Sequence, residues 1–250
     1  MADLGAWVVV ALVAAAFLAG LIDSIAGGGG LITVPALLLA GVAPIDALGT
    51  NKLQAVFGSG SATIAYGRAG HVDLRAMLPL ASVSAAGSAV GAVVANVVPG
   101  DALDVMIPVA LVLVAVYFLV RPDPGDIERP RRISPTAFAI GIVPVIGFYD
   151  GVFGPGTGSF FMVAYVGLAG YGILRATAHT KVLNFASNLG ALIVFAVSGS
   201  MIVGLGLAMG TAQILGASTG SRLAIRHGGR IIRPLLVVTC IAMAVRLIIG

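Results

Sequence analysis

The stretch Gly20-Leu-Ile-Asp23-Ser-Ile-Ala-Gly27-Gly-Gly-Gly30 interrupts a hydrophobic segment with one aspartate and a run of four glycines. A related stretch, Gly147-Phe-Tyr-Asp150-Gly-Val-Phe-Gly154-Pro-Gly-Thr-Gly158, occurs in the second half of the chain. Because glycine lets the backbone turn sharply, each stretch is expected to end one helix and begin another. A helix start exposes free N–H groups and attracts anions. The two breaks therefore predict a helical protein with two candidate anion-binding helix ends, although the glycines could instead serve close helix packing.

A lysine follows each break inside a hydrophobic segment: Lys52 in Gly49-Thr-Asn-Lys-Leu-Gln, and Lys181 in Ala178-His-Thr-Lys-Val-Leu-Asn. A cation within a membrane is costly and marks a candidate functional site, and an ammonium group suits an oxyanion. If helices start near Asp46 and Gly172, the lysines lie roughly 9 and 13 Å along them, which approaches the middle of a hydrocarbon core about 30 Å thick. The alternatives are that the lysines extend to the membrane surface or pair with aspartates.

The composition is that of a polytopic membrane protein. Of the 250 residues, 59% are hydrophobic and 10% are charged, whereas soluble domains carry about 25% charged residues. The single cysteine, Cys240, permits no internal disulfide and no cysteine-based metal site, and we expect no cofactor. The N-terminus lacks the basic region of a signal peptide and is interpreted as the start of the first span.

Ten apolar segments can be drawn, and two of them are too short to cross a membrane comfortably. These two, 31–43 and 158–170, each follow a glycine break and are candidate half-helices or re-entrant pieces. The others are 5–25, 46–67, 76–98, 103–121, 135–153, 173–197, 201–221 and 231–249.

The two halves of the chain resemble each other. The sequence numbers of Lys52 and Lys181 differ by 181 − 52 = 129, and those of Asp23 and Asp150 differ by 150 − 23 = 127. Internal duplication is typical of transporters. We therefore predict an N-terminal repeat over 1–121, a cytoplasmic linker over 122–134 and a C-terminal repeat over 135–250.

Arginines at segment ends predict the orientation, because cytoplasmic loops are rich in basic residues. The same bias accounts for the excess of basic over acidic residues, so this excess does not require nucleic-acid binding. The turn that holds Arg68 and Arg75 is expected in the cytoplasm, but its partner in the second half, Ser198-Gly-Ser-Met, is uncharged and is expected outside. The halves are therefore predicted to be inverted, with both termini outside the inner membrane. The arginines expected on the cytoplasmic side also include Arg121, Arg129, Arg131, Arg132, Arg175, Arg222, Arg226, Arg230 and Arg233, and the aspartates expected opposite are Asp3, Asp46, Asp101 and Asp104.

Polar side chains flank both lysines and complete the candidate substrate site. Lys181, Asn184 and Asn188 share one helical face, and an amide face inside a span suits oxyanion oxygens or joins helices. Asp23 and Asp150 are candidate proton or cation carriers, or structural groups that cap a helix or neutralise a lysine. The predicted substrate-binding residues are Gly28, Gly29, Gly30, Asn51, Lys52, Gln54, Gly156, Thr157, His179, Thr180, Lys181, Asn184 and Asn188.

These paired motifs resemble the TauE/SafE sulfite-exporter family of membrane permeases. The resemblance rests on Gly-x-x-Asp-Ser-x-x-Gly-Gly-Gly-Gly with Gly-Thr-Asn-Lys, and on the Asp150 stretch with His-Thr-Lys-x-x-Asn, and it covers nearly the whole chain. It implies transport of sulfur-containing anions such as sulfite or sulfoacetate. The halves are not identical, since Thr50-Asn51 is matched by His179-Thr180.

The leading hypothesis is a secondary transporter that exports a small sulfur oxyanion or organosulfonate by alternating access. The alternatives are an anion channel or an uptake permease for another small organic anion. An intramembrane enzyme built on Ser24 and His179 has no nucleophile-elbow context to support it. The expected partners are the substrate and the lipid bilayer, and the pairs Gly87/Gly91 and Gly216/Gly220 are compatible with close packing or a homodimer.

Overall fold

The computed structural model describes residues 5–107, 109–110 and 128–228, and all regular structure within these ranges is helical. The first half contains α1 (Ala6–Ala26), α2 (Gly30–Leu39), α3 (Pro44–Arg68) and α4 (Leu78–Val97), and residues 100–107 are also helical. The second half contains α6 (Pro135–Ala137), a π-helical turn η1 (Phe138–Ile142), α7 (Val143–Val152), α8 (Thr157–Gly167), α9 (Ile173–Ser198) and α10 (Val203–His227). The all-α fold class is confirmed. The expected segment 231–249 and most of 103–121 lie outside the described residues.

Within the described residues, four stretches are long and apolar enough to cross a membrane: Ala6–Ala26, Leu78–Val97, Pro135–Val152 and Ile173–Ser198. The helices α2 and α8 have 10 and 11 residues, about 15 to 17 Å at 1.5 Å per residue, which is about half of the hydrocarbon core. The short helices are therefore confirmed where the glycine breaks predicted them. The helices α3 and α10 have 25 residues each but are less apolar.

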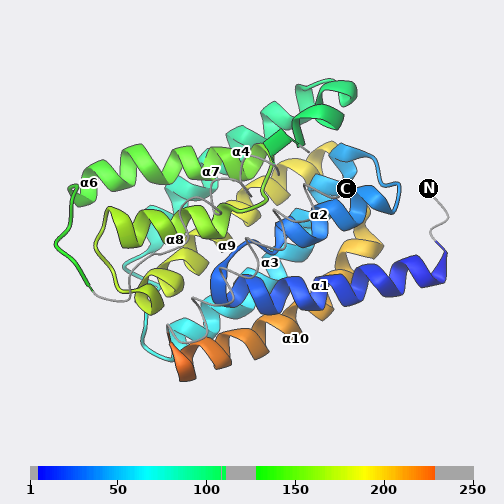
Figure 1. The fold of residues 1–250 in the computed structure, drawn as a ribbon. Coiled ribbons are helices and arrows are strands. Elements are labelled where there is room, and N and C mark those ends of the chain that lie inside the picture. Colours follow the sequence, from blue (N-terminus) through cyan, green and yellow to red (C-terminus); the bar gives the residue numbers. More distant parts are fainter. Residues whose placement is uncertain (1–4, 108, 111–127, 229–250) are drawn as a thin grey trace.

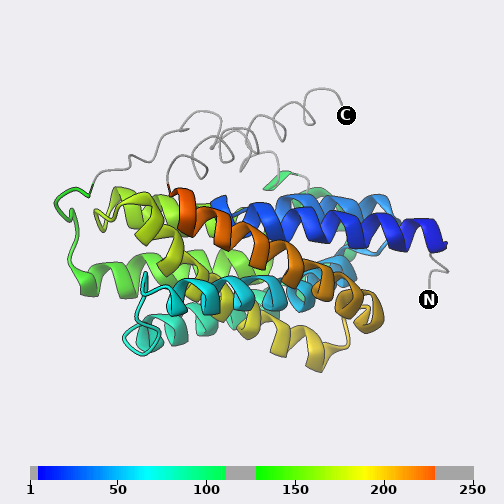
Figure 2. The ribbon, with the colours of Figure 1, turned by 90° about the horizontal axis from the view of Figure 1, so that it is seen from below.

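The two broken helix pairs enter the molecule from opposite ends (Figure 1). In that view α1 runs inward from the right and α6–α7 from the left; α2 and α8 then return towards the end from which the preceding helix came. Figure 2 shows the same opposed directions. This arrangement supports the predictions of re-entrant pieces and inverted halves. The inverted relation, and the repeat boundaries at 121 and 135, remain predictions.

Helices of each half pack against a helix of the other half, and the contacts of the two halves correspond. The helix α1 packs on α10 and α7 packs on α4, while α3 packs on α10 and α9 packs on α4. An ideal Cβ on Gly87 would meet the backbone of Pro144, and one on Gly216 would meet the backbone of Phe17. These contacts are related by the same offsets, 144 − 17 = 127 and 216 − 87 = 129. The glycine pairs are thus used for close packing inside the chain, and homodimer formation stays a prediction.

Basic and acidic segments gather at opposite ends of the bundle. The segments 68–77, 128–134 and 168–175 and the end of α10 lie together at the left of Figure 1. They carry Arg68, Arg75, Arg129, Arg131, Arg132, Arg175, Arg222 and Arg226. The segments 40–46 and 98–104 lie at the opposite end and carry Asp46, Asp101 and Asp104. We call these the arginine end and the aspartate end. Arg121, Arg230, Arg233 and Asp3 lie outside the described residues.

Candidate functional site

Two buried ion pairs connect the halves of the chain. Lys52 Nζ on α3 lies 2.8 Å from Asp150 Oδ1 on α7, and Lys181 Nζ on α9 lies 3.0 Å from Asp23 Oδ2 on α1. Each ammonium group also donates to the backbone carbonyl of the same aspartate. Both lysines are fully buried, so neither extends to the membrane surface. Each lysine is paired with the aspartate of the other half.

The lysines occupy matching positions on their helices. Lys52 is the ninth residue of α3, which begins at Pro44, and Lys181 is the ninth residue of α9, which begins at Ile173. At about 1.5 Å per residue, each is about 12 Å from its helix start. The depths expected from the sequence differed slightly because they assumed helix starts at Asp46 and Gly172.

The two glycine breaks are in direct contact. Ser159 Oγ donates to the carbonyl of Ala26 at 3.2 Å. An ideal Cβ on Gly27 would lie 2.5 Å from the backbone nitrogen of Ser159, and one on Gly30 would lie 3.2 Å from Pro155 Cα. At Gly27 only glycine permits this approach, so the two breaks meet inside the molecule.

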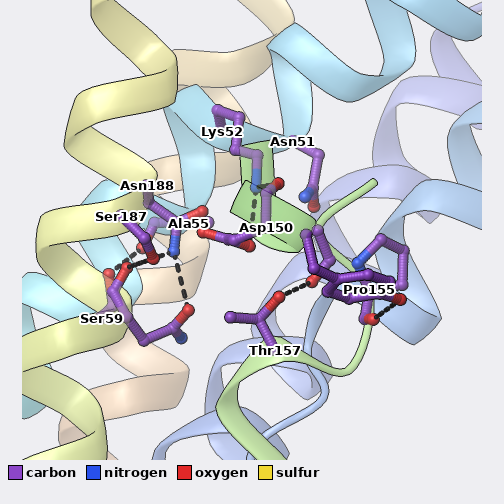
Figure 3. Close-up of polar contacts among 12 residues, drawn as sticks. Asn51, Lys52, Ala55, Ser59, Asp150, Pro155, Thr157, Ser187 and Asn188 are labelled. Carbon is purple, nitrogen blue, oxygen red and sulfur yellow. Dashed lines mark hydrogen bonds and ion pairs between the residues drawn. The ribbon is translucent and has the colours of Figure 1, made fainter. Parts of the chain in front are cut away.

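The second break also lies against both lysines. An ideal Cβ on Gly154 would lie 2.8 Å from Lys52 Nζ, and one on Gly158 would lie 3.5 Å from Lys181 Nζ. Figure 3 shows Lys52 pointing at Asp150, with Pro155 and Thr157 of this break to one side. The loop Gly154–Gly158 is therefore placed between the two ammonium groups.

The two aspartates are not equivalent. Asp23 Oδ1 accepts the N–H of Gly29 at 3.2 Å, and its Oδ2 faces Lys181, so this carboxylate both caps α2 and neutralises a lysine. Asp150 uses Oδ1 for Lys52, and its Oδ2 is buried and accepts no hydrogen bond from the described residues. A buried carboxylate oxygen without a donor is unusual. The asymmetry gives the Asp150 side a free polar atom that the Asp23 side lacks.

The amides of the first half join helices. Asn51 Oδ1 accepts from Thr33 Oγ1 of α2 at 2.6 Å and from Gln54 Nε2 at 3.0 Å. Gln54 Oε1 is buried and unpartnered among the described residues. Thr50 Oγ1 accepts the N–H of Ile202 at 2.9 Å and so supports the start of α10. Asn51 and Gln54 therefore form one cluster next to Lys52 in the chain, and part of its hydrogen-bonding capacity is already used.

The polar residues of the second half divide into two groups. Asn188 Nδ2 donates to Asn184 Oδ1 at 3.2 Å, and the buried Thr180 hydroxyl has no partner among the described residues. In Figure 3, Asn188 lies on the opposite side of the Lys52 pair from Asn51. His179 Nδ1 instead lies 2.8 Å from the Arg175 carbonyl, and this side chain lines a cavity at the arginine end. It does not join the ion pairs.

Backbone conformation explains why glycine occurs at two of the predicted binding positions, Gly28 and Gly156. Gly28 has φ 91° and Gly156 has φ 85°, a region that favours glycine. Thr157 Oγ1 donates to the carbonyl of Gly154 at 2.8 Å, which tightens the second break before α8.

Sequence reasoning missed two tyrosines that hold the breaks. Tyr66 Oη donates to the Ser24 carbonyl at 2.8 Å, and Tyr149 Oη donates to the Pro155 carbonyl at 2.7 Å. The first satisfies a carbonyl in the last turn of α1, which the helix end leaves free, and the second satisfies a carbonyl within the second break. The position of Tyr149 directly before Asp150 was the available signal.

Comparisons with known proteins give a consistent result. The family model described as sulfite exporter TauE/SafE matches residues 12–247. The chain is 55% identical to the probable membrane transporter protein ORF9 of a Sinorhizobium species over 99% of this chain and 95% of that protein. It is 44% identical to the probable membrane transporter protein YfcA of Escherichia coli strain K12 over 93% and 87%, and 39% identical to a probable membrane transporter protein of Haemophilus influenzae over 98% and 96%. No solved structure matches the chain.

Proposed function

The chain belongs to the sulfite exporter TauE/SafE family, and on this basis we propose that it exports a small sulfur oxyanion or organosulfonate as a secondary transporter. The apolar helices and the relatives named as membrane transporters make it an integral membrane protein and a transporter of this family. The substrate, the direction and the placement of the arginine end in the cytoplasm, with both termini outside the inner membrane, belong to the proposal.

The observation that carries the proposal is the pair of crossed Lys–Asp contacts at two touching helix breaks. Lys52 and Lys181 approach the loop Gly154–Gly158 from helices of different halves. Helix starts at broken segments near the membrane midplane bind anionic groups in transporters. An oxyanion held here would contact elements from both halves, so movement of one half against the other would change the side from which it is reached.

The breaks must separate before an anion can lie between them. Gly27 leaves no room beside Ser159, and we interpret this contact as a closed arrangement of the proposed site. We assign alternating access to opening of this break-to-break contact from one end at a time.

The charges of the central cluster sum to zero, because two lysines face two aspartates. An anion gains the attraction of a lysine only when the competing carboxylate is neutralised or displaced. Asp150, with one unpartnered oxygen among the described residues, is the carboxylate best placed to take up a proton. The proposal therefore includes proton-linked movement of the anion through the Lys52–Asp150 pair.

Radiolabelled sulfite and sulfoacetate in proteoliposomes test the proposed activity. We expect saturable flux that is accelerated by substrate on the opposite side, and we expect loaded cells that lack the protein to lose the anion more slowly. Discrete single-channel currents would instead identify a channel. Accumulation in cells against a gradient would identify an uptake permease.

Asp150→Asn tests the link to protons. We expect an imposed pH gradient to accelerate wild-type flux several-fold and to have no effect on the variant, because an amide cannot carry the proton. Exchange of anion without a gradient should persist. Asp101→Asn, at an exposed position of the aspartate end, is the control and should keep the full response. A gradient response retained by Asp150→Asn would remove Asp150 from the coupling step.

A further inference from the structure

A cavity of about 640 Å³ opens at the arginine end, away from the ion pairs. Its walls come from the loop after α3, the segment before α6, the end of α8 and the start of α9. The polar lining residues are His71, Asp73, Arg131, Tyr171, Arg175 and His179, together with Tyr165. His179 lies on α9 two positions before Lys181, so the cavity and the Lys181–Asp23 pair are supported by the same helix.

The lining favours an anion. Arg131 and Arg175 contribute two fixed positive charges, whereas Asp73 is the carboxylate in the lining. Asp73 Oδ1 already accepts the backbone N–H groups of Arg75 and Ala76, at 2.9 and 3.2 Å. Glu128 lies 3.3 Å from Arg175, but both side chains are more than half exposed, and such surface pairs contribute little.

A buried tyrosine in the wall lacks a hydrogen-bond partner. Tyr165 is 3% exposed, and its hydroxyl has no partner among the described residues. Its ring stacks on Tyr171 with centroids 5.5 Å apart and lies 4.8 Å from Phe138. Buried hydroxyl groups are normally satisfied, so this hydroxyl is a donor available to a ligand in the cavity.

Neighbouring aromatic groups hold the cationic side in place. The Arg175 guanidinium lies 4.3 Å above the Tyr171 ring, and His179 packs edge-on against Tyr171 at 4.9 Å. The contact of His179 Nδ1 with the Arg175 carbonyl leaves Nε2 for another partner. A bound anion would thus meet a preorganised set of donors.

The remaining lining is apolar and limits the class of ligand. Met77, Leu80 and Phe138 face the cavity, and ligand pockets of about 300–1,000 Å³ typically combine such walls with a few polar groups. We propose that this cavity is an entry site for an organic anion with a short apolar body, such as an alkanesulfonate, which binds here before it reaches Lys181. The inference rests on the proposed transport function for its role, while the site itself can be tested by binding alone.

Equilibrium binding of radiolabelled propanesulfonate to the purified full-length protein tests the site. We expect Tyr165→Phe and Arg175→Gln each to weaken binding by about tenfold or more, the range for a hydrogen bond to a charged group. Tyr165→Phe should fold normally, because its hydroxyl has no partner to lose among the described residues. Arg222→Gln removes an exposed arginine at the same end, outside the lining, and should bind as the wild type does.

Binding is repeated in the Lys181→Met/Asp23→Asn/Lys52→Met/Asp150→Asn background, which removes both buried ion pairs, so that the central site does not contribute. Affinity losses that persist in this background support the entry site, even if flux is absent. Unchanged affinity in both cavity variants, an equal loss in Arg222→Gln, or sulfite binding as tightly as propanesulfonate would overturn it. So would displacement by phosphatidylglycerol at low concentration, which would make the cavity a lipid headgroup site. If the cavity variants bind as tightly as the wild type while saturable flux is normal, the entry site is overturned and the transport proposal remains intact.

Discussion

Lys52→Met is expected to abolish saturable anion flux and to destabilise the protein. The change removes the ammonium group that lies 2.8 Å from Asp150 Oδ1 and leaves that carboxylate buried without its cation. Breaking a buried pair by removing one partner costs about 3–5 kcal/mol. Flux in proteoliposomes and the thermal midpoint in detergent measure the two effects.

The double variant Lys52→Met/Asp150→Asn separates the two roles of the lysine. It removes both charges, and replacement of a buried ion pair by neutral groups is often close to neutral for stability. We therefore expect the thermal midpoint to recover most of its loss while flux stays at least a hundredfold below wild type. Arg222→Met, which replaces an exposed cation at the arginine end, controls for the loss of one positive charge. Recovery of flux together with stability would show that Lys52 is structural and would contradict its role in substrate binding.

The same design applied to Lys181 and Asp23 is expected to give a milder structural effect. Asp23 is partly exposed, with 13% of its side-chain surface accessible, whereas Asp150 has 2%. Asp23 also keeps the N–H of Gly29 as a second partner. Water and that donor can stabilise the carboxylate after Lys181 is removed. A larger loss of stability in Lys181→Met than in Lys52→Met would contradict this ranking.

The sequence predicted the helical class and the short helices because these follow from local chemistry. Glycine runs interrupt helices wherever they occur, and segment length decides which pieces can cross a membrane. The constant offset between the two halves also identified which groups correspond. It did not show that Lys52 pairs with Asp150 and Lys181 with Asp23, because that exchange depends on how the halves pack.

The polar residues around the lysines show the limit of reading a helical face. Asn184 and Asn188 lie on one face as predicted, but they bond each other. His179 shares the motif of Lys181, yet two positions along a helix turn its side chain away from the lysine, and it faces the cavity at the arginine end. His71 lies in the loop after α3, far from His179 in the sequence, and only the tertiary fold places the two in the same cavity.

Gly27→Ala is expected to reduce both stability and flux more than any other single glycine change at the breaks. Gly27 has φ 82° and ψ 172°, a combination that is almost exclusive to glycine and costs about 1–3 kcal/mol for other residues. Its new Cβ would also lie 2.5 Å from the Ser159 nitrogen. Overpacking of this kind adds about 1–3 kcal/mol, and the contacting atom is backbone, so it cannot simply rotate away.

Two further variants separate backbone strain from the contact between the breaks. Gly41→Ala has a similar φ of 81° but open space around the new Cβ, so it reports the cost of positive φ without the contact. Gly158→Ala has no positive φ, and its Cβ would lie 3.1 Å from Gly27 Cα, so it presses on the same contact from the other side. We expect flux to fall at least tenfold in Gly27→Ala, to fall less in Gly158→Ala and to be unchanged in Gly41→Ala. If Gly41→Ala matched Gly27→Ala in both thermal midpoint and flux, positive φ alone would explain the effect. The contact between the breaks would then have no part in transport.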